Sequence, residues 1–313
     1  MTITQLKYVL AVAEHQNFTK AAAHVFVTQP TLSMQIQKLE EELSILIFDR
    51  SKKPIELTEV GEKIVNQARN IVNESERMQD VVDQEKGFIG GDFRLGIIPT
   101  VMPTLLPMFL KSFIKKYPKV HLKIEELTTA EIIIKLNDGH LDAAIAATPL
   151  VQEKIKERVL YFEPFVGYVP INHRLSSKKY LDRSDLDIND ILLLEDGHCF
   201  RDGVINICKS LKHNSATDSF QVESGSFETL IKLSNEGFGM TLLPYLNTLD
   251  IPKEEQKKYL RYFNEPSPAR EVSLLYRKSE LKMQIIDSLY DIIASIIRGA
   301  ITFQNVKIIS PLR

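Results

Sequence analysis

One long amphipathic segment dominates the first third of the sequence. Between residues 58 and 86 there is no proline and, after Gly61, no glycine, while apolar and small residues recur at steps of three and four. These residues are Val60, Ile64, Ala68, Ile71, Ser75, Met78 and Val82. The spacing predicts one helix of about 28 residues. A helix of that length does not stand alone in water, so its stripe indicates a dimerising partner.

Glycines directly after this helix mark the clearest domain boundary. They are Gly87, Gly90 and Gly91. With 313 residues, the chain also exceeds what one hydrophobic core usually serves. The expected parts are a domain of short helices at residues 1–58, the long helix and its linker at 59–90, an α/β domain at 91–300 and a C-terminal tail at 301–313.

Strand and helix patterns alternate after Asp92. Buried strands are predicted at residues 93–98 and 141–146, and an alternating strand at 120–125. Helices are predicted at 105–116 and 130–137. Alternating elements of this length favour largely parallel sheets with crossover helices.

The composition limits location more than function. Hydrophobic residues make up 44% and charged residues 26%, as in an ordinary globular protein. No apolar run approaches the roughly 18 residues of a membrane span. The N-terminus has no basic leader followed by a small-residue cleavage site, so we expect a cytoplasmic protein without membrane contact. The net charge of −2 gives no sign of a polyanionic partner, so DNA binding has to be argued from geometry.

Residues 1–58 carry the signals of short helices joined by tight turns. Asn17 or Thr19 can cap a second helix, and Thr28 can cap a third, with Pro30 in its first turn. The alternation at 55–57 predicts a small strand. A helix, a tight turn and a helix with short polar side chains on its first turn suit the DNA major groove. The same pattern also fits a capped helix in a plain helical bundle.

A longer match decides between these interpretations. Its stretches are Phe18-Thr19-Lys20-Ala21-Ala22, then Val27-Thr28-Gln29-Pro30-Thr31-Leu32-Ser33 continuing to Glu40, then Phe48-Asp49-Arg50 and Leu57-Thr58-Glu59-Val60-Gly61. Together they resemble the winged helix-turn-helix of LysR-type bacterial transcription regulators. The sequence departs from that family at Ser44, where glycine is common after the recognition helix.

The resemblance implies which residues contact operator DNA. Those implied at base edges or phosphates are Gln29, Pro30, Thr31 and Ser33. Arg50, with Lys52 nearby, is implied as the wing residue at the minor groove, although Lys52 alone also fits a solvated charge. The long helix becomes the dimerisation helix. The implied assembly is a homotetramer, a dimer of dimers on double-stranded operator DNA, with RNA polymerase as a further partner.

The only two cysteines, Cys199 and Cys208, lie nine residues apart. A structural zinc site needs four ligands in close pairs, and no second cluster exists, so metal binding is not expected. Both can be buried thiols that behave as small hydrophobes. For Cys199 the neighbours His198 and Arg201 are cations or donors able to favour thiolate over thiol.

The surrounding sequence resembles the peroxide-sensing branch of the LysR family. The matching stretches are Leu194-Glu195-Asp196-Gly197-His198-Cys199 with Cys208, residues 96–101, 126–129, 227–230, 239–244 and 275–277. This resemblance implies that Cys199 is the peroxidatic residue and Cys208 the resolving one. It implies that Thr100, Thr129 and His198 hydrogen-bond peroxide and water, and that Arg270 helps to hold the thiolate. No cofactor is implied, and cytosolic thiol reductants reset the switch.

If residues 200–207 form a helix or a packed turn in the reduced protein, the disulfide is a refolding switch. Nine residues at about 1.5 Å per residue separate the two Cα atoms by up to about 13 Å, whereas a disulfide requires less than about 7 Å. The bond therefore cannot form unless the segment refolds.

Two alternatives stay open at this point. The resemblance implies that the α/β domain at 91–300 is built like a periplasmic binding protein, with one lobe at about 91–163 plus 269–300 and the other at about 164–268. In the first alternative, this domain binds a small metabolite in the cleft between the lobes. In the second, the chain is an enzyme or a solute-binding protein. No catalytic triad or phosphate-binding glycine loop is present, so we expect no enzyme.

Overall fold

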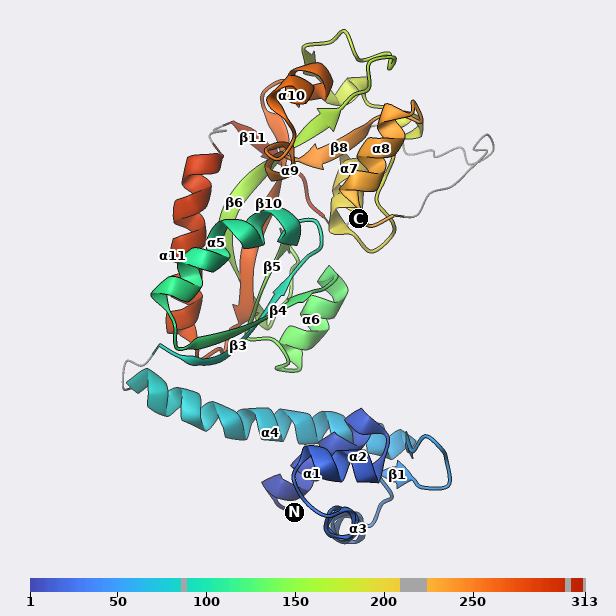
Figure 1. Ribbon diagram of the computed structural model, residues 1–313, viewed down its shortest axis with the longest axis vertical. Helices are drawn as coiled ribbons and strands as arrows, with labels where there is room; N and C mark the ends of the chain where they lie inside the picture. The colour runs from blue at the N-terminus through green and yellow to red at the C-terminus, as the bar shows by residue number, and fades with distance from the viewer. Residues whose placement is uncertain (86–88, 209–223, 302–304, 312–313) are drawn as a thin grey trace. The chain divides into compact units, whose positions relative to one another are not determined.

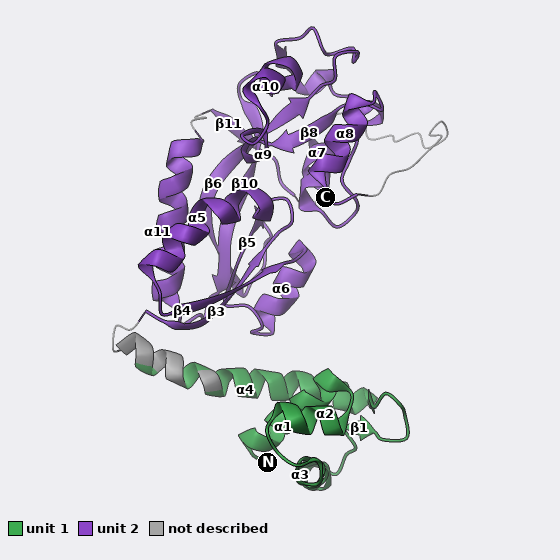
Figure 2. Ribbon diagram, in the orientation of Figure 1, with its two compact units in different colours: residues 1–88 green, residues 89–313 purple. Residues whose placement is uncertain are grey.

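The structure is a computed structural model that describes residues 1–85, 89–208, 224–301 and 305–311 (Figure 1). The chain divides into two units, Met1–Phe88 and Ile89–Arg313 (Figure 2). Within the described ranges, no helix is both long and apolar enough to cross a membrane.

The first unit is a helical domain with a two-stranded wing. Its elements are α1 (Ile3–His15), α2 (Phe18–His24), α3 (Gln29–Leu43), β1 (Phe48–Asp49), β2 (Glu56–Leu57) and α4 (Glu59–Glu85). The predicted caps are confirmed. Asn17 accepts the amides of Thr19 and Lys20 at the start of α2, and Thr28 accepts the amide of Thr31 at the start of α3. Ser44 ends α3 in the left-handed conformation, with φ of 55°.

The long predicted helix is confirmed as α4. One part of its apolar stripe is covered within the unit, and another part is exposed. Ala68 is buried, and Ile64 and Ile71 pack against the core that α1, α2 and α3 form within the same unit. Val60, Met78 and Val82 are exposed, with Met78 at 72%. Part of the stripe is therefore covered within the chain, and only the remainder is left for a partner helix.

The second unit is built on a mixed sheet. Its strands are β3 (Gly91–Ile97), β4 (Val120–Glu126), β5 (Ala143–Thr148), β6 (Ile155–Tyr168), β7 (Tyr180–Leu181), β8 (Thr241–Pro244), β9 (Leu260–Phe263), β10 (Ser267–Arg277) and β11 (Val306–Ile308). Its helices are α5 (Met102–Lys116), α6 (Thr129–Asn137), α7 (Cys199–Ile207), α8 (Phe227–Asn235), α9 (Tyr245–Thr248), α10 (Lys253–Tyr259) and α11 (Met283–Ala300), with 3-10 turns at Arg183–Asp185 and Ile188–Asp190. Figure 1 shows α11 and α6 on opposite sides of the strands.

The prediction of largely parallel sheets is only partly right. Strand β3 runs parallel to β4 and β5, as predicted, but β10 runs antiparallel to both β5 and β6. Strands β6 and β10 are long because they continue from one lobe of the unit into the other. The strand predicted at 141–146 is observed at Ala143–Thr148, and Asp142 just before it bonds to Arg94 through both its backbone amide and its carboxylate.

This unit has two large hydrophobic cores and a small one made of Val166, Tyr168, Leu243 and Leu260. The first core includes Phe93, Phe109, Ile145, Val272 and Leu289, and the second includes Phe165, Leu181, Phe200, Val204 and Met240. The described part of the C-terminal tail belongs to the fold. Strand β11 pairs in parallel with β10, and Ile309 is buried in the second core.

Candidate redox site and nucleic-acid interface

Helix α7 holds both cysteines, one at each end. Cys199 is its first residue and Cys208 caps its C-terminus, and both are free thiols. The helix packs by one apolar face into the second core through Phe200, Val204 and Ile207. Of the two conformations considered for residues 200–207, the helix is the one observed, so the two Cα atoms lie about 13 Å apart at 1.5 Å per residue.

Polar groups from three other elements surround the sulfur of Cys199. Thr129, at the start of α6, and the backbone N–H of Ala147 on β5 lie close enough to the thiol to lower its pKa. The Thr129 hydroxyl is buried and has no hydrogen-bond partner among the described residues. Burial raises the pKa of the Cys199 thiol above its usual value, while Arg270, Thr129 and Ala147 pull that pKa down.

Arg270 is the cation of this site, and it is fully buried rather than part of a surface pair. It faces Glu163 as a direct cross-strand pair between β10 and β6, with Nε and Nη2 donating to Glu163 Oε2 at 2.9 and 2.7 Å. Nη1 donates to the Thr100 hydroxyl at 2.8 Å, and Nη2 to the Thr100 carbonyl at 3.1 Å. The guanidinium lies 5.2 Å from the ring centre of Phe200, next to Cys199.

The sequence neighbours of Cys199 play other parts than expected. The nitrogen Nε2 of His198 lies 3.4 Å from a carboxylate oxygen of Glu195. Arg201 donates to the carbonyl of Leu194 at 2.9 Å and pairs with Asp196. The prediction that adjacent cations favour the thiolate is therefore wrong in its assignment. The start of a helix directs Arg201 back toward the preceding loop, and the cation that lowers the pKa of Cys199 is Arg270, 71 residues away in sequence.

Cys208 sits in an apolar setting. Its side chain is buried in the second core, and burial raises the pKa of the thiol to about 11, with a smaller effect of Asp187 in the same direction. Arg183 binds the end of α7 here, donating to the carbonyls of Asn206 at 2.9 Å and Ile207 at 3.3 Å. In this arrangement Cys208 is a packing residue, and only Cys199 is placed among groups that could bind a small polar oxidant.

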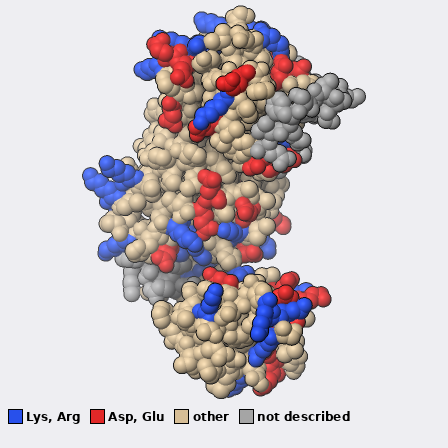
Figure 3. Space-filling view, turned by 45° about the vertical axis from the view of Figure 1, so that its right-hand side comes forward, with Lys and Arg blue, Asp and Glu red and all other residues tan. Residues whose placement is uncertain are grey.

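The predicted DNA-binding residues gather at one end of α3. Gln29, Pro30 and Thr31 are exposed on its first turn, and Ser33 is half-buried on the next. The Thr31 hydroxyl lies 2.8 Å from that of Thr28. Acidic and basic side chains are interspersed on the face drawn in Figure 3, so no single-sign patch marks a DNA surface there.

The wing is held by a carboxylate that the sequence interpretation did not single out. Glu40 on α3 is buried and accepts the amides of Ile47 and Phe48 at 2.8 and 3.2 Å. Arg50 pairs with the same carboxylate at 2.7 Å and lies 5.3 Å from the ring centre of Phe18. Lys52 is exposed. Arg50 thus anchors the wing, and Lys52 extends into solvent from the turn.

Comparisons with known proteins agree with both parts of the chain. Residues 3–62 match the family of bacterial regulatory helix-turn-helix proteins of the lysR type, and residues 86–295 match the LysR substrate binding domain. The chain belongs to the LysR family of bacterial regulators.

Within that family, the similarity is to peroxide-responsive proteins. A "hydrogen peroxide-inducible genes activator" of Pectobacterium carotovorum is 33% identical over 279 residues, which cover 88% of this chain and 90% of the relative. A full-length OxyR variant from Pseudomonas aeruginosa has a TM-score of 0.76 at 34% identity, covering 94% of this chain and 98% of that one. A hydrogen-peroxide-bound OxyR mutant from Corynebacterium glutamicum has a TM-score of 0.64 at 27% identity, covering 98% of both chains.

Sequence reasoning missed Glu163, Ala147 and Glu40. A signal existed for Glu163, since it is the only acidic residue in the otherwise apolar run from Leu160 to Val169. Ala147 acts through its backbone amide, and a pattern of side chains in the sequence cannot predict such a contact.

Proposed function

We propose that this protein is a DNA-binding transcription regulator that senses hydrogen peroxide through a reversible disulfide between Cys199 and Cys208. The observation that carries the proposal is the surroundings of Cys199, where Thr129, the Ala147 amide and Arg270 converge on one sulfur. The names of the similar proteins support it, because they describe peroxide-inducible activators and an OxyR with peroxide bound.

The chemistry uses only these two residues and peroxide. The Cys199 thiolate attacks one peroxide oxygen, so that an S–O bond forms, the O–O bond breaks and hydroxide leaves as water after taking a proton. The resulting sulfenic acid is attacked by the sulfur of Cys208, the S–S bond forms and a second water leaves. The two thiols are oxidised and peroxide is reduced to two waters. Cytosolic dithiols reverse the change by thiol–disulfide exchange.

We assign different roles to the four residues expected around Cys199, which are Thr100, Thr129, His198 and Arg270. Thr129 and Arg270 act on the sulfur directly, and Thr100 orients Arg270 through two hydrogen bonds. His198 is assigned a place in the loop that precedes α7, where it faces Glu195. The protein is proposed to act as a regulator and not as an enzyme, since each oxidation ends in a stable disulfide.

The disulfide can form only if α7 unwinds, and this conformational change transmits the oxidation of Cys199 to the rest of the domain. A disulfide requires Cα atoms closer than about 7 Å, which the helix does not allow. Unwinding withdraws Phe200, Val204 and Cys208 from the second core and frees the carbonyls that Arg183 holds. The changed regulatory domain then alters how a cytoplasmic homotetramer, a dimer of dimers, contacts operator DNA and RNA polymerase.

Mass spectrometry of the full chain under mild peroxide tests the redox step. We expect a peptide pair joined through Cys199 and Cys208 and lighter by two hydrogen atoms than the reduced pair. Cys199→Ser should abolish the reaction, whereas Cys208→Ser should still be oxidised at Cys199. If the wild type keeps both thiols while its promoter responds in cells, the protein is instead a sensor of a metabolite bound between the lobes. Footprinting on operator DNA with reduced and oxidised protein then tests whether the contacts change.

A further inference from the structure

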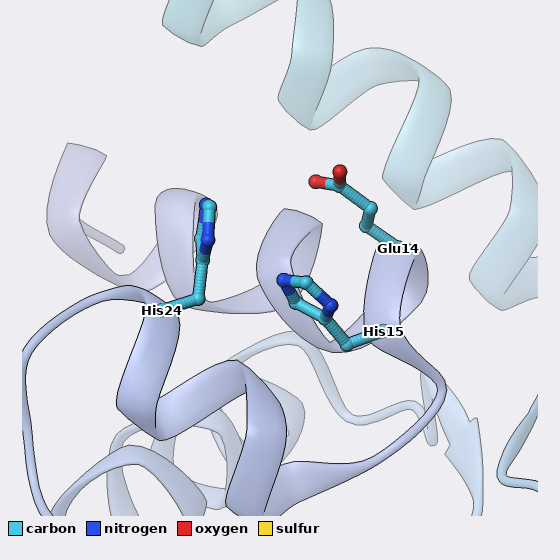
Figure 4. Close-up of side chains that lie close together, drawn as sticks. All are labelled: Glu14, His15 and His24. Carbon is cyan, nitrogen blue, oxygen red and sulfur yellow. The ribbon is translucent and has the colours of Figure 1, made fainter.

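The helical domain contains a cluster of metal-binding side chain types that the redox function does not use. Glu14 and His15 end α1, and His24 ends α2. One ligand atom from each residue lies within 4.8 Å of the other two. Figure 4 shows the carboxylate and the two imidazoles turned toward the same space between the helix ends. We propose that these three residues bind a divalent transition-metal cation such as Zn²⁺.

The donor set identifies the class of cation. Imidazole nitrogens suit Zn²⁺, Ni²⁺, Co²⁺ and Cu²⁺, whereas Mg²⁺ and Ca²⁺ prefer sites made of oxygen. Two histidines and a carboxylate supply three ligands, and water completes the coordination shell as it does in open zinc sites. A hard cation is therefore not the expected occupant.

One nitrogen of the cluster has no other partner. The Nε2 atom of His15 is enclosed and has no hydrogen-bond partner among the described residues. The His15 and His24 rings meet at a centroid distance of 4.8 Å and an angle of 59°. A buried imidazole nitrogen without a partner calls for a ligand that the side chains around it do not provide.

The local electrostatics favour a cation at this point. His15 and His24 are the last residues of their helices, and the carbonyl ends of α1 and α2 carry the negative ends of the two helix dipoles. The Glu14 carboxylate adds a full negative charge beside them. Metal–nitrogen distances of about 2.0–2.1 Å require the ligand atoms to close by roughly 1.5 Å. Glu14 and His24 are exposed and can make that rotation, while the half-buried His15 stays as the anchor.

A bound cation would tie the end of α1 to the end of α2. The next residue after His15 is Gln16, whose carbonyl accepts the amide of Ile55 in the wing at 3.2 Å. The site therefore fixes the turn on which the base of the wing rests. We assign it to the stability of the DNA-binding domain, independently of the peroxide reaction.

Calorimetric titration of the full chain with ZnCl₂ tests the site. The cysteines compete for zinc, so the titrations use a Cys199→Ser, Cys208→Ser background. We expect one Zn²⁺ per chain and a higher unfolding temperature for the helical domain when Zn²⁺ is added. His15→Ala and His24→Ala should each weaken Zn²⁺ binding at least about tenfold, because even outer-sphere partners of a metal cost that much.

Glu14→Gln and His121→Ala provide the second variant and the control. Glu14→Gln keeps the shape of an exposed side chain and should weaken binding without affecting folding. His121 is an exposed histidine on β4, outside the cluster, so its replacement should leave the affinity unchanged. The absence of saturable binding, or equal affinity in His24→Ala and His121→Ala, would overturn the site. Neither result bears on the peroxide proposal.

Discussion

Cys199 and Cys208 occupy opposite ends of one helix and contact different hydrophobic cores. Cys199 packs against the first core of the α/β unit, and Cys208 is buried in the second. Joining their sulfurs therefore changes the packing of α7 against both lobes. Phe200, Val204 and Ile207 on the apolar face of α7 belong to the second core, so unwinding of α7 would take them out of it.

The first prediction concerns the pH dependence of oxidation. Burial raises the pKa of Cys199, so the reactive thiolate is the minor form at neutral pH. Its fraction, and with it the peroxide rate constant, should increase about tenfold per pH unit from pH 6 to 8. Stopped-flow measurement on Cys208→Ser isolates this step. A rate constant that is flat over this range would mean that Arg270 outweighs burial.

The second prediction separates two adjacent threonines. Thr129→Val removes the hydroxyl beside the sulfur and should slow oxidation about tenfold, since a hydrogen bond to a charged group contributes about 1.5–3 kcal/mol. Its unfolding free energy should change by less than about 0.5 kcal/mol. Thr128 instead caps α6 by accepting the amide of Glu131. Thr128→Val should cost about 1 kcal/mol of stability and leave the rate unchanged. Identical behaviour of the two variants would remove Thr129 from the site.

The third prediction distinguishes Arg50 from Lys52. Arg50→Ala leaves the buried Glu40 without its cation and should lower both stability, by about 1 kcal/mol, and operator affinity. Lys52→Ala should lower the salt dependence of DNA binding without affecting stability, if the side chain meets a phosphate. Chemical denaturation measures the free energy of unfolding, and binding titrations at several salt concentrations measure operator affinity and its salt dependence. Full stability in Arg50→Ala would contradict the anchoring role of Glu40.

The fourth prediction tests the end of α3. Ser44 adopts φ of 55°, a conformation that costs a residue with a side chain about 1 kcal/mol more than glycine. Ser44→Gly should therefore stabilise the helical domain by about 0.5–1 kcal/mol. The same substitution at Ser75, inside α4, should destabilise it by a similar amount. Calorimetric unfolding measures whether each substitution raises or lowers the stability. A loss of stability in Ser44→Gly would contradict the prediction that Ser44 is strained.

The fifth prediction concerns the tail. Ile309 is buried in the second core, and the carbonyl of Ser310 accepts the side-chain amide of Asn206 at 3.0 Å. Ile309→Ala should destabilise the reduced protein by about 2–4 kcal/mol. If α7 unwinds on oxidation, part of this loss of stability is confined to the reduced form. The reduction potential of the disulfide then falls by about 30 mV per 1.4 kcal/mol, so the disulfide becomes harder to reduce. Titration in glutathione buffers measures the shift. An unchanged redox midpoint would show that the tail contributes equally to both states.

Local signals were sufficient for the helices of the first domain and their caps. Asn17 and Thr28 cap the helices that follow them, and Pro30 fits the first turn of α3, because caps depend on residues only two or three positions apart. The nine-residue spacing of the cysteines already implied their separation once a helix joins them. The resemblance added the family, which the comparisons confirm.

Long-range pairing was not available from these signals. Arg270 meets Glu163 across the register of β10 and β6, and Thr100 lies 170 residues from it in sequence. Sequence spacing could offer only His198 and Arg201 as cations near Cys199, and Arg270 was implied by the family resemblance alone. The register of two antiparallel strands decides which buried charges face each other, and a shift of one residue would reverse every side chain on the strand. The sequence therefore determined the two cysteines and their spacing, whereas the tertiary structure decided that a helix joins them, which groups surround the sulfur and how strongly its burial opposes ionisation.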